Sequence, residues 1–76
     1  MTKMVKILDV MGMRTPTTVL KIALKSAYMK RGDVLDVRGD CPNLEQDVEA
    51  WCKRLGKALL SVTHYKGEKV NIRIAF

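Results

Sequence analysis

Two cysteines and one histidine, Cys41, Cys52 and His64, are the side chains of this chain best suited to nucleophilic or acid–base chemistry. The thiolate is the reactive form of cysteine, so a reactive cysteine needs surroundings that lower its pKa. Cys41 lies in a turn between Asp40 and Pro42 that opens a predicted helix. Unpaired backbone N–H groups at such a helix start favour negative charge. The sequence therefore indicates Cys41 as the candidate nucleophile, with an unreactive cysteine that only fills the turn as the alternative.

Cys52 and His64 are predicted to be structural. Cys52 follows Trp51 within an apolar helical stripe, and a buried cysteine behaves as a small hydrophobic residue. His64 lies on a predicted strand, far in topology from the turn that contains Cys41, and the sequence places no Ser, Cys or acidic partner beside it. The cysteines are not spaced like metal ligands, so we expect no metal site, no disulfide and no cofactor.

A second helix start of the same kind follows the first predicted strand. Gly12 permits a sharp turn, Thr15 can cap the helix, and Pro16 can occupy its first position. Asp9 is expected to accept hydrogen bonds from the amides of this turn. The amides at residue 15 would also favour an anion or a thiolate, so Thr15 marks a candidate site, with a plain cap as the alternative.

Hydrophobic periodicity predicts the element order β-α-β-α-β-β in a single domain over residues 1–76. Strands are expected at residues 3–10 and 34–38 and as a hairpin within 57–76, and helices at about 16–29 and from 42 or 44 to 55. Because β-α-β crossovers are right-handed, both helices should cover the same face of the sheet. The fold class is therefore α+β, a two-layer sandwich with two helices on one face.

Alternation along the strands predicts which side chains are buried. In the second strand Leu35 and Val37 should be buried, while Asp36 and Arg38 should face water. In the hairpin one face should be shared by Leu60, Val62 and His64. The first helix should bury a stripe that recurs at three- and four-residue steps: Val19, Leu20, Ile22, Ala23, Leu24, Ala27 and Tyr28.

Two parallel strands joined through a helix deliver their following loops to the same edge of the sheet. Thr15 and Cys41 should therefore be neighbours at the edge where α/β sheets usually bind ligands. Arg14 and Arg38 are expected within reach of Cys41, where positive charge and helix amides would lower the pKa of its thiol.

Fourteen Lys and Arg residues against eight Asp and Glu residues give a formal net charge of +6, which favours acidic proteins and polyanions as partners. Aromatic residues make up 5% of the chain and suggest no stacking platform, so nucleic-acid binding would depend on phosphate contacts and weaken with salt. No apolar run approaches the roughly 20 residues that cross a bilayer, and the first residues lack a signal-peptide pattern. A cytoplasmic protein with no membrane association is predicted.

The chain resembles the TusA/SirA-like family of small sulfur-carrier proteins at several places. The family motif Leu-Asp-x-x-Gly-x-x-Cys-Pro-x-Pro is matched at Leu8, Asp9, Gly12 and Pro16. Residues 30–35 and 47–56 match further pieces of the family pattern. The resemblance implies a mixed four-stranded sheet and a role in sulfur relay. It also implies that the persulfide-bearing cysteine of the family falls on Thr15 and its second proline on Thr18. A threonine hydroxyl cannot form a persulfide.

Three functions remain open from the sequence. The first is a TusA-like sulfur relay, with sulfur carried on Cys41 and received from a cysteine desulfurase, a rhodanese-like protein or another relay protein, or with the chain as a non-catalytic binding partner. The second is a basic RNA-binding or translation-linked module, since this sandwich is similar to the C-terminal domain of a bacterial translation initiation factor. The third is a regulatory domain that binds another protein through the edge at Thr15.

Overall fold

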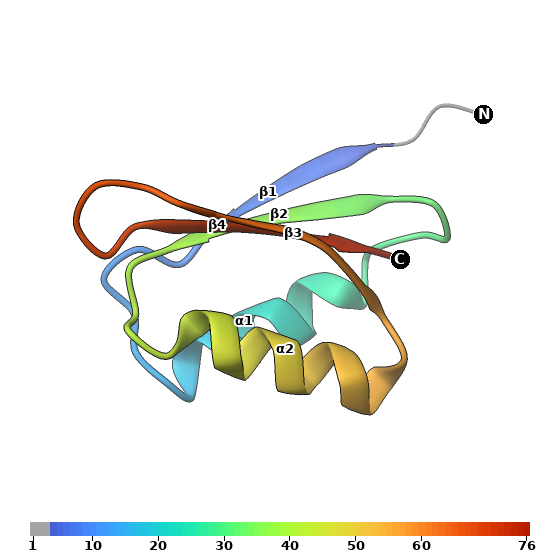
Figure 1. Ribbon diagram of the computed structural model, residues 1–76. Coiled ribbons are helices and arrows are strands. Elements are labelled where there is room, and N and C mark those ends of the chain that lie inside the picture. The colour runs from blue at the N-terminus through green and yellow to red at the C-terminus, as the bar shows by residue number, and fades with distance from the viewer. Residues whose placement is uncertain (1–3) are drawn as a thin grey trace.

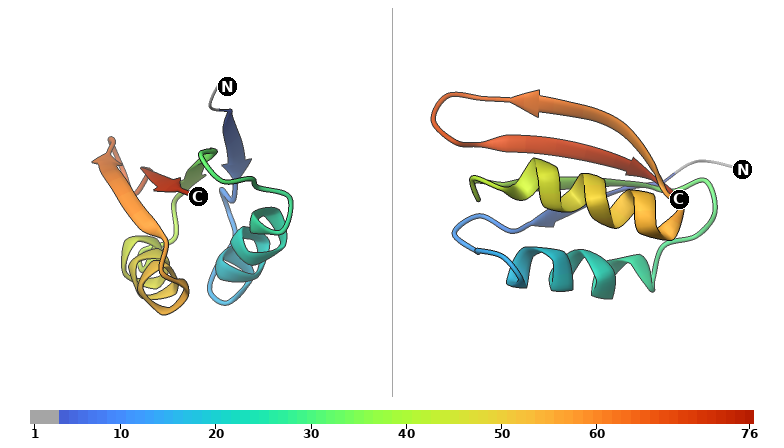
Figure 2. Two further views of the ribbon diagram at one scale, coloured as in Figure 1. Left: turned by 90° about the vertical axis from the view of Figure 1, so that its right-hand side faces the viewer. Right: turned by 60° about the horizontal axis from the view of Figure 1, so that its bottom comes forward.

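The computed structural model describes residues 4–76, so residue 3, where the first strand was predicted to begin, lies outside the described residues. Six elements follow one another in the predicted order (Figure 1). They are β1 (Val5–Asp9), α1 (Thr17–Ser26), β2 (Val34–Gly39), α2 (Leu44–Leu55), β3 (Ala58–His64) and β4 (Val70–Ala75). The two helices cover one face of the sheet and leave the other uncovered (Figure 2), which confirms the α+β two-layer prediction. No helix within residues 4–76 is long and apolar enough to cross a membrane.

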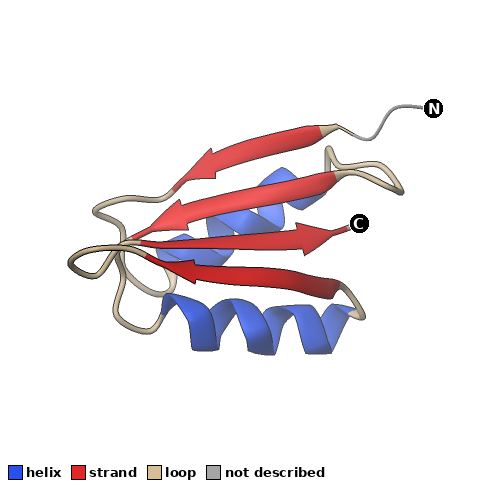
Figure 3. Cartoon of the chain, turned by 45° about the horizontal axis from the view of Figure 1, so that its top comes forward, coloured by secondary structure: helices blue, strands red, loops and turns tan. Residues whose placement is uncertain are grey.

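The sheet has four strands in the order β1-β2-β4-β3. β1 and β2 run parallel, with Val5 opposite Val34, whereas β4 is antiparallel to both β2 and β3, so the sheet is mixed. As a result β1, β2 and β3 end, and β4 begins, at one edge of the sheet (Figure 3). We call this the carboxyl edge. It comprises the loops at residues 10–16 and 40–43 and the hairpin turn at 65–69.

The core lies between the sheet and the helices. Its fully buried side chains come from β2, β4 and both helices and include Leu35, Val37, Ile72, Ile74, Ile22, Leu44 and Val48. Packing around Gly39 leaves no room for a side chain, because an added Cβ would lie 2.6 Å from Leu44 Cδ2 and 2.9 Å from Val10 Cγ2. At the other end of α2, Gly56 adopts a left-handed conformation with φ 69° and ends the helix where predicted.

The predicted apolar stripe of α1 is only partly correct. Thr18 and Ile22 are its buried residues, whereas Leu20, Leu24 and Tyr28 are 59%, 66% and 75% exposed. Figure 2 shows the reason: α1 lies beneath the β1 side of the sheet and α2 beneath the β3 side. Because β1 is an edge strand, the outer flank of α1 has no neighbouring element to cover it.

The alternation predicted for β2 is confirmed, but the predicted exposure of Asp36 and the predicted face of Leu60 are wrong. Asp36 is only 2% exposed, because Arg38 and Arg73 reach it from the uncovered face, with side-chain N···O distances of 3.6 and 3.8 Å. In β3 the register shifts between Leu59 and Ser61, a β-bulge. One extra residue reverses the alternation, so Leu59 joins Val62 and His64 on the helix-facing side and Leu60 is exposed.

Candidate functional site

Cys41 and Thr15 are neighbours at the carboxyl edge, the juxtaposition expected from two parallel strands. The Thr15 Oγ1 atom lies 3.8 Å from the Cys41 Sγ atom. Cys41 lies two residues after the end of β2, and a cis peptide bond joins Thr15 to Pro16 just before α1. Pro16 is the N-cap and α1 begins at Thr17, so the prediction that Thr15 caps the helix is wrong. Only 5% of Cys41 is exposed and the residue belongs to the buried core cluster, so its thiol lies largely beneath the molecular surface.

The hydroxyl of Thr15 lies between two acceptors. Besides its contact with Cys41 Sγ, it donates a hydrogen bond to the Oδ2 atom of Asp47 in the first turn of α2. A hydroxyl has one proton, so it can donate to only one of the two at a time. Asp47 therefore competes with the sulfur for the Thr15 proton, a coupling that the sequence did not reveal.

The surroundings of Cys41 favour its thiolate. Burial alone would raise the pKa of the thiol. Hydrogen bonds from the backbone amides of Asn43 and Thr15, the Thr15 hydroxyl and the positive charge of Arg14 outweigh that effect, and the pKa of Cys41 falls below its usual value. The other cysteine behaves in the opposite way: Cys52 is 3% exposed on α2, and burial raises its pKa.

Asp40 joins the two loops that hold this pair. Its Oδ1 atom accepts a hydrogen bond of 2.8 Å from the amide of Gly12 and lies 3.6 Å from Arg14 Nη1. Asp9 stabilises the first loop locally, because its Oδ1 atom accepts a 2.8 Å bond from the amide of Met11. The carboxylate of Asp40 thus keeps Arg14 and the Gly12 turn beside the loop of Cys41.

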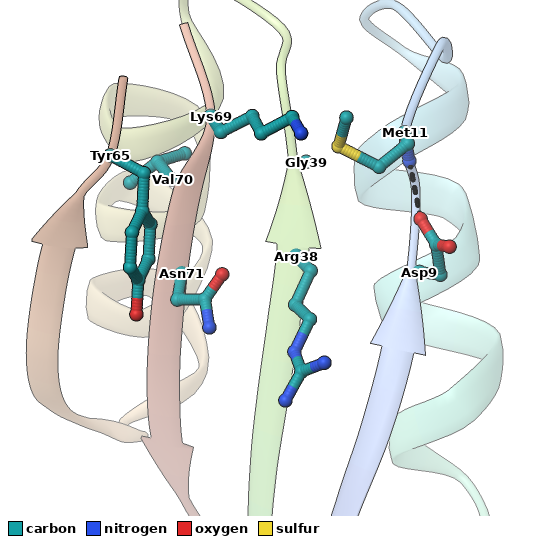
Figure 4. Close-up of a pocket in the computed structure, with 8 residues that line it drawn as sticks. All are labelled: Asp9, Met11, Arg38, Gly39, Tyr65, Lys69, Val70 and Asn71. Atoms are coloured by element: carbon teal, nitrogen blue, oxygen red, sulfur yellow. Dashed lines mark hydrogen bonds between the residues drawn. The ribbon is translucent and has the colours of Figure 1, made fainter. Parts of the chain in front are cut away.

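Arg38 lies elsewhere. Its guanidinium group pairs with Asp36 on the uncovered face of the sheet and lines a hollow that does not include Cys41 (Figure 4). Of the two arginines expected near the thiol, Arg14 is the one whose charge acts on the pKa of Cys41.

His64 is closer to Cys41 than its position in the chain suggested, and the prediction that it is remote and without an acidic partner is wrong. Since β3 ends at the carboxyl edge, His64 Nε2 meets Glu45 Oε1 at 2.9 Å. The two side chains line a cavity of about 210 Å³ together with Cys41, Pro42 and Glu68. Counting antiparallel register back from Gly39 through Val70 would have placed His64 here, because these residues are paired across the sheet.

A protein-family model described as "Sulfurtransferase TusA" matches residues 6–75 of this chain. The chain belongs to the TusA family. Two relatives, each named "Putative sulfur carrier protein" and found in Neisseria meningitidis serogroups A and B, are each 35% identical to it over 60 residues. Those residues cover 79% of this chain and 81% of each relative.

The candidate site at the carboxyl edge is built from a thiol, a hydroxyl, backbone amides and an arginine. Among residues 4–76 no three His, Cys, Asp or Glu side chains lie close enough together to hold a metal ion. This arrangement can stabilise a thiolate or a persulfide anion through hydrogen bonds and positive charge.

Proposed function

We propose that this TusA-family protein is a sulfur carrier that has diverged at position 15 and carries persulfide sulfur on Cys41. Sulfur-relay partners follow from the family; a cysteine desulfurase, a rhodanese-like protein or another relay protein is the proposed donor. The observation that carries the proposal is the 3.8 Å approach of Cys41 Sγ to Thr15 Oγ1. The Cys41 sulfur thus lies within contact distance of the side-chain atom at position 15.

Transfer needs no external oxidant. The Cys41 thiolate attacks the terminal sulfur of the donor persulfide, a new S–S bond forms on Cys41, and the S–S bond of the donor breaks. The donor cysteine leaves as a thiolate, which takes up the proton that the Cys41 thiol released. A lowered pKa aids both directions, because it increases the thiolate fraction before attack and makes Cys41 a better leaving group when sulfur is passed on.

Mass spectrometry of the intact protein after incubation with a cysteine desulfurase and cysteine tests this proposal. The expected result is a mass gain of one sulfur atom that a thiol reductant reverses, retained in Cys52→Ser and lost in Cys41→Ser. Cys52→Ser is the matched control because it removes the other thiol from a buried site.

Absence of the added sulfur on the wild-type protein, or its retention in Cys41→Ser, would overturn the proposal. If the desulfurase binds the protein without loading it, the protein is a non-catalytic partner in sulfur transfer instead.

A further inference from the structure

The uncovered face of the sheet carries a hollow of about 210 Å³ at the carboxyl edge, separate from Cys41. Figure 4 looks onto this face, with the helices behind the strands. The hollow runs across the end of the sheet, from Tyr65 just after β3, over Asn71 on β4 and Arg38 on β2, to Met11 beyond β1. Its volume is below the roughly 300–1,000 Å³ of pockets that enclose drug-sized ligands. The hollow can therefore hold one planar group of a larger ligand, while the rest of that ligand lies on the open surface.

One wall of the hollow is an aromatic ring. Tyr65 is 52% exposed, and its ring stands on the β3 side with one face turned toward Asn71 and Arg38 (Figure 4). The amide group of Asn71 lies between the ring and the guanidinium group of Arg38. An exposed aromatic face beside an amide and a guanidinium group provides stacking and hydrogen bonding for a flat heterocycle.

The remaining groups make this face positive. Arg38 and Lys69 line the hollow, and the Lys69 ammonium group extends across its end toward Gly39 (Figure 4). The buried carboxylate of Asp36 is shared by two guanidinium groups, those of Arg38 and Arg73, so one positive charge stays uncompensated. The Asp9 carboxylate at the far end accepts a hydrogen bond from the amide of Met11. The cations Arg38, Arg73 and Lys69 still outnumber the carboxylates of Asp36 and Asp9 on this face.

We propose that this face binds single-stranded nucleic acid, with one base stacked on Tyr65 and backbone phosphates held by Arg38 and Lys69. Stacking needs a base that is free of its partner strand, so a duplex should not fit the hollow. The low aromatic content of the chain argued against such a role, but the tertiary structure places an exposed ring among the cations. This proposal does not depend on sulfur transfer by Cys41.

Fluorescence anisotropy with a short, fluorescein-labelled oligoadenylate, titrated with the protein at several salt concentrations, tests the site. Wild-type protein should bind the single strand more tightly than the matching duplex. Tyr65→Leu should weaken binding by about fivefold or more, since stacking is worth about 1–3 kcal/mol per base, whereas Tyr65→Phe, which keeps the ring, should retain affinity. Arg38→Gln and Lys69→Gln should each lower the salt-dependence slope by about 0.7.

The matched control is the double variant Lys21→Gln/Lys25→Gln, which removes two positive charges from α1 on the other layer of the molecule. Compared with Arg38→Gln/Lys69→Gln, it should lose far less affinity. Equal losses in the two double variants, unchanged binding by Tyr65→Leu, equal affinity for the duplex, or no binding at low salt would each overturn the proposal. Circular dichroism of every variant verifies that the fold is retained.

Discussion

The Thr15 hydroxyl couples Asp47 to the reactivity of Cys41, and replacing Asp47 by Ala should make that coupling measurable. In the wild-type protein the Asp47 carboxylate and the Cys41 sulfur, which lies 3.8 Å from the hydroxyl oxygen, compete for the single hydroxyl proton. Without the Asp47 carboxylate, the Cys41 thiolate is the remaining acceptor for the hydrogen bond that the Thr15 hydroxyl donates. The substitution also removes a negative charge from the site. Both changes stabilise the thiolate, so the pKa of Cys41 should fall further.

The size of the shift follows from the geometry. A hydrogen bond to a charged group contributes about 1.5–3 kcal/mol, and the long O···S separation favours the lower end of that range. Loss of the partly exposed Asp47 charge adds about 0.5–1 kcal/mol in a medium close to water. Because one pKa unit corresponds to about 1.4 kcal/mol, these contributions together should lower the pKa of Cys41 by about one and a half units.

The assay measures the rate of Cys41 alkylation by iodoacetamide as a function of pH. It uses a Cys52→Ser background, so that Cys41 is the thiol that reacts. Asp47→Ala should move the midpoint of the profile toward acid. Glu49→Ala is the matched control, since it removes an exposed carboxylate from the same helix without touching Thr15, and it should shift the midpoint far less. A midpoint that stays in place or moves toward alkali in Asp47→Ala, or an equal shift in Glu49→Ala, would refute the coupling through Thr15.

Two further predictions concern the loops at the carboxyl edge. Thr15→Cys in a Cys41→Ser background should restore sulfur loading by a cysteine desulfurase, because the new thiol would occupy the motif position of the family just before α1. Intact-mass measurement checks this. A protein that stays unloaded would show that the site has diverged beyond this one residue. Gly39→Ala should lower the free energy of unfolding by about 1–3 kcal/mol, since the added methyl group would overlap the side chains of Leu44 and Val10. Urea denaturation measures that loss, and an unchanged midpoint would mean that both neighbours can move aside.

Much of the architecture follows from local patterns in the sequence. The end of α2 at residue 55 was predicted from the sequence alone, since helix periodicity and capping depend on residues close in the chain. The proximity of Thr15 and Cys41 also followed, because a parallel β-α-β unit sends both loops to one edge. The β-bulge after Leu59 did not, because an extra residue in one strand is defined only by pairing with β4.

The sequence by itself determined the order of the elements, the two-layer arrangement and the pair of helix starts at one edge, because periodicity and chain chirality are enough to specify them. Only the tertiary structure decided that Asp47 shares the Thr15 proton, that His64 meets Glu45 beside Cys41, and that Tyr65 stands among cations on the uncovered face. Each of these contacts joins segments far apart in the chain. Their distances depend on strand register and helix placement, which no local pattern records.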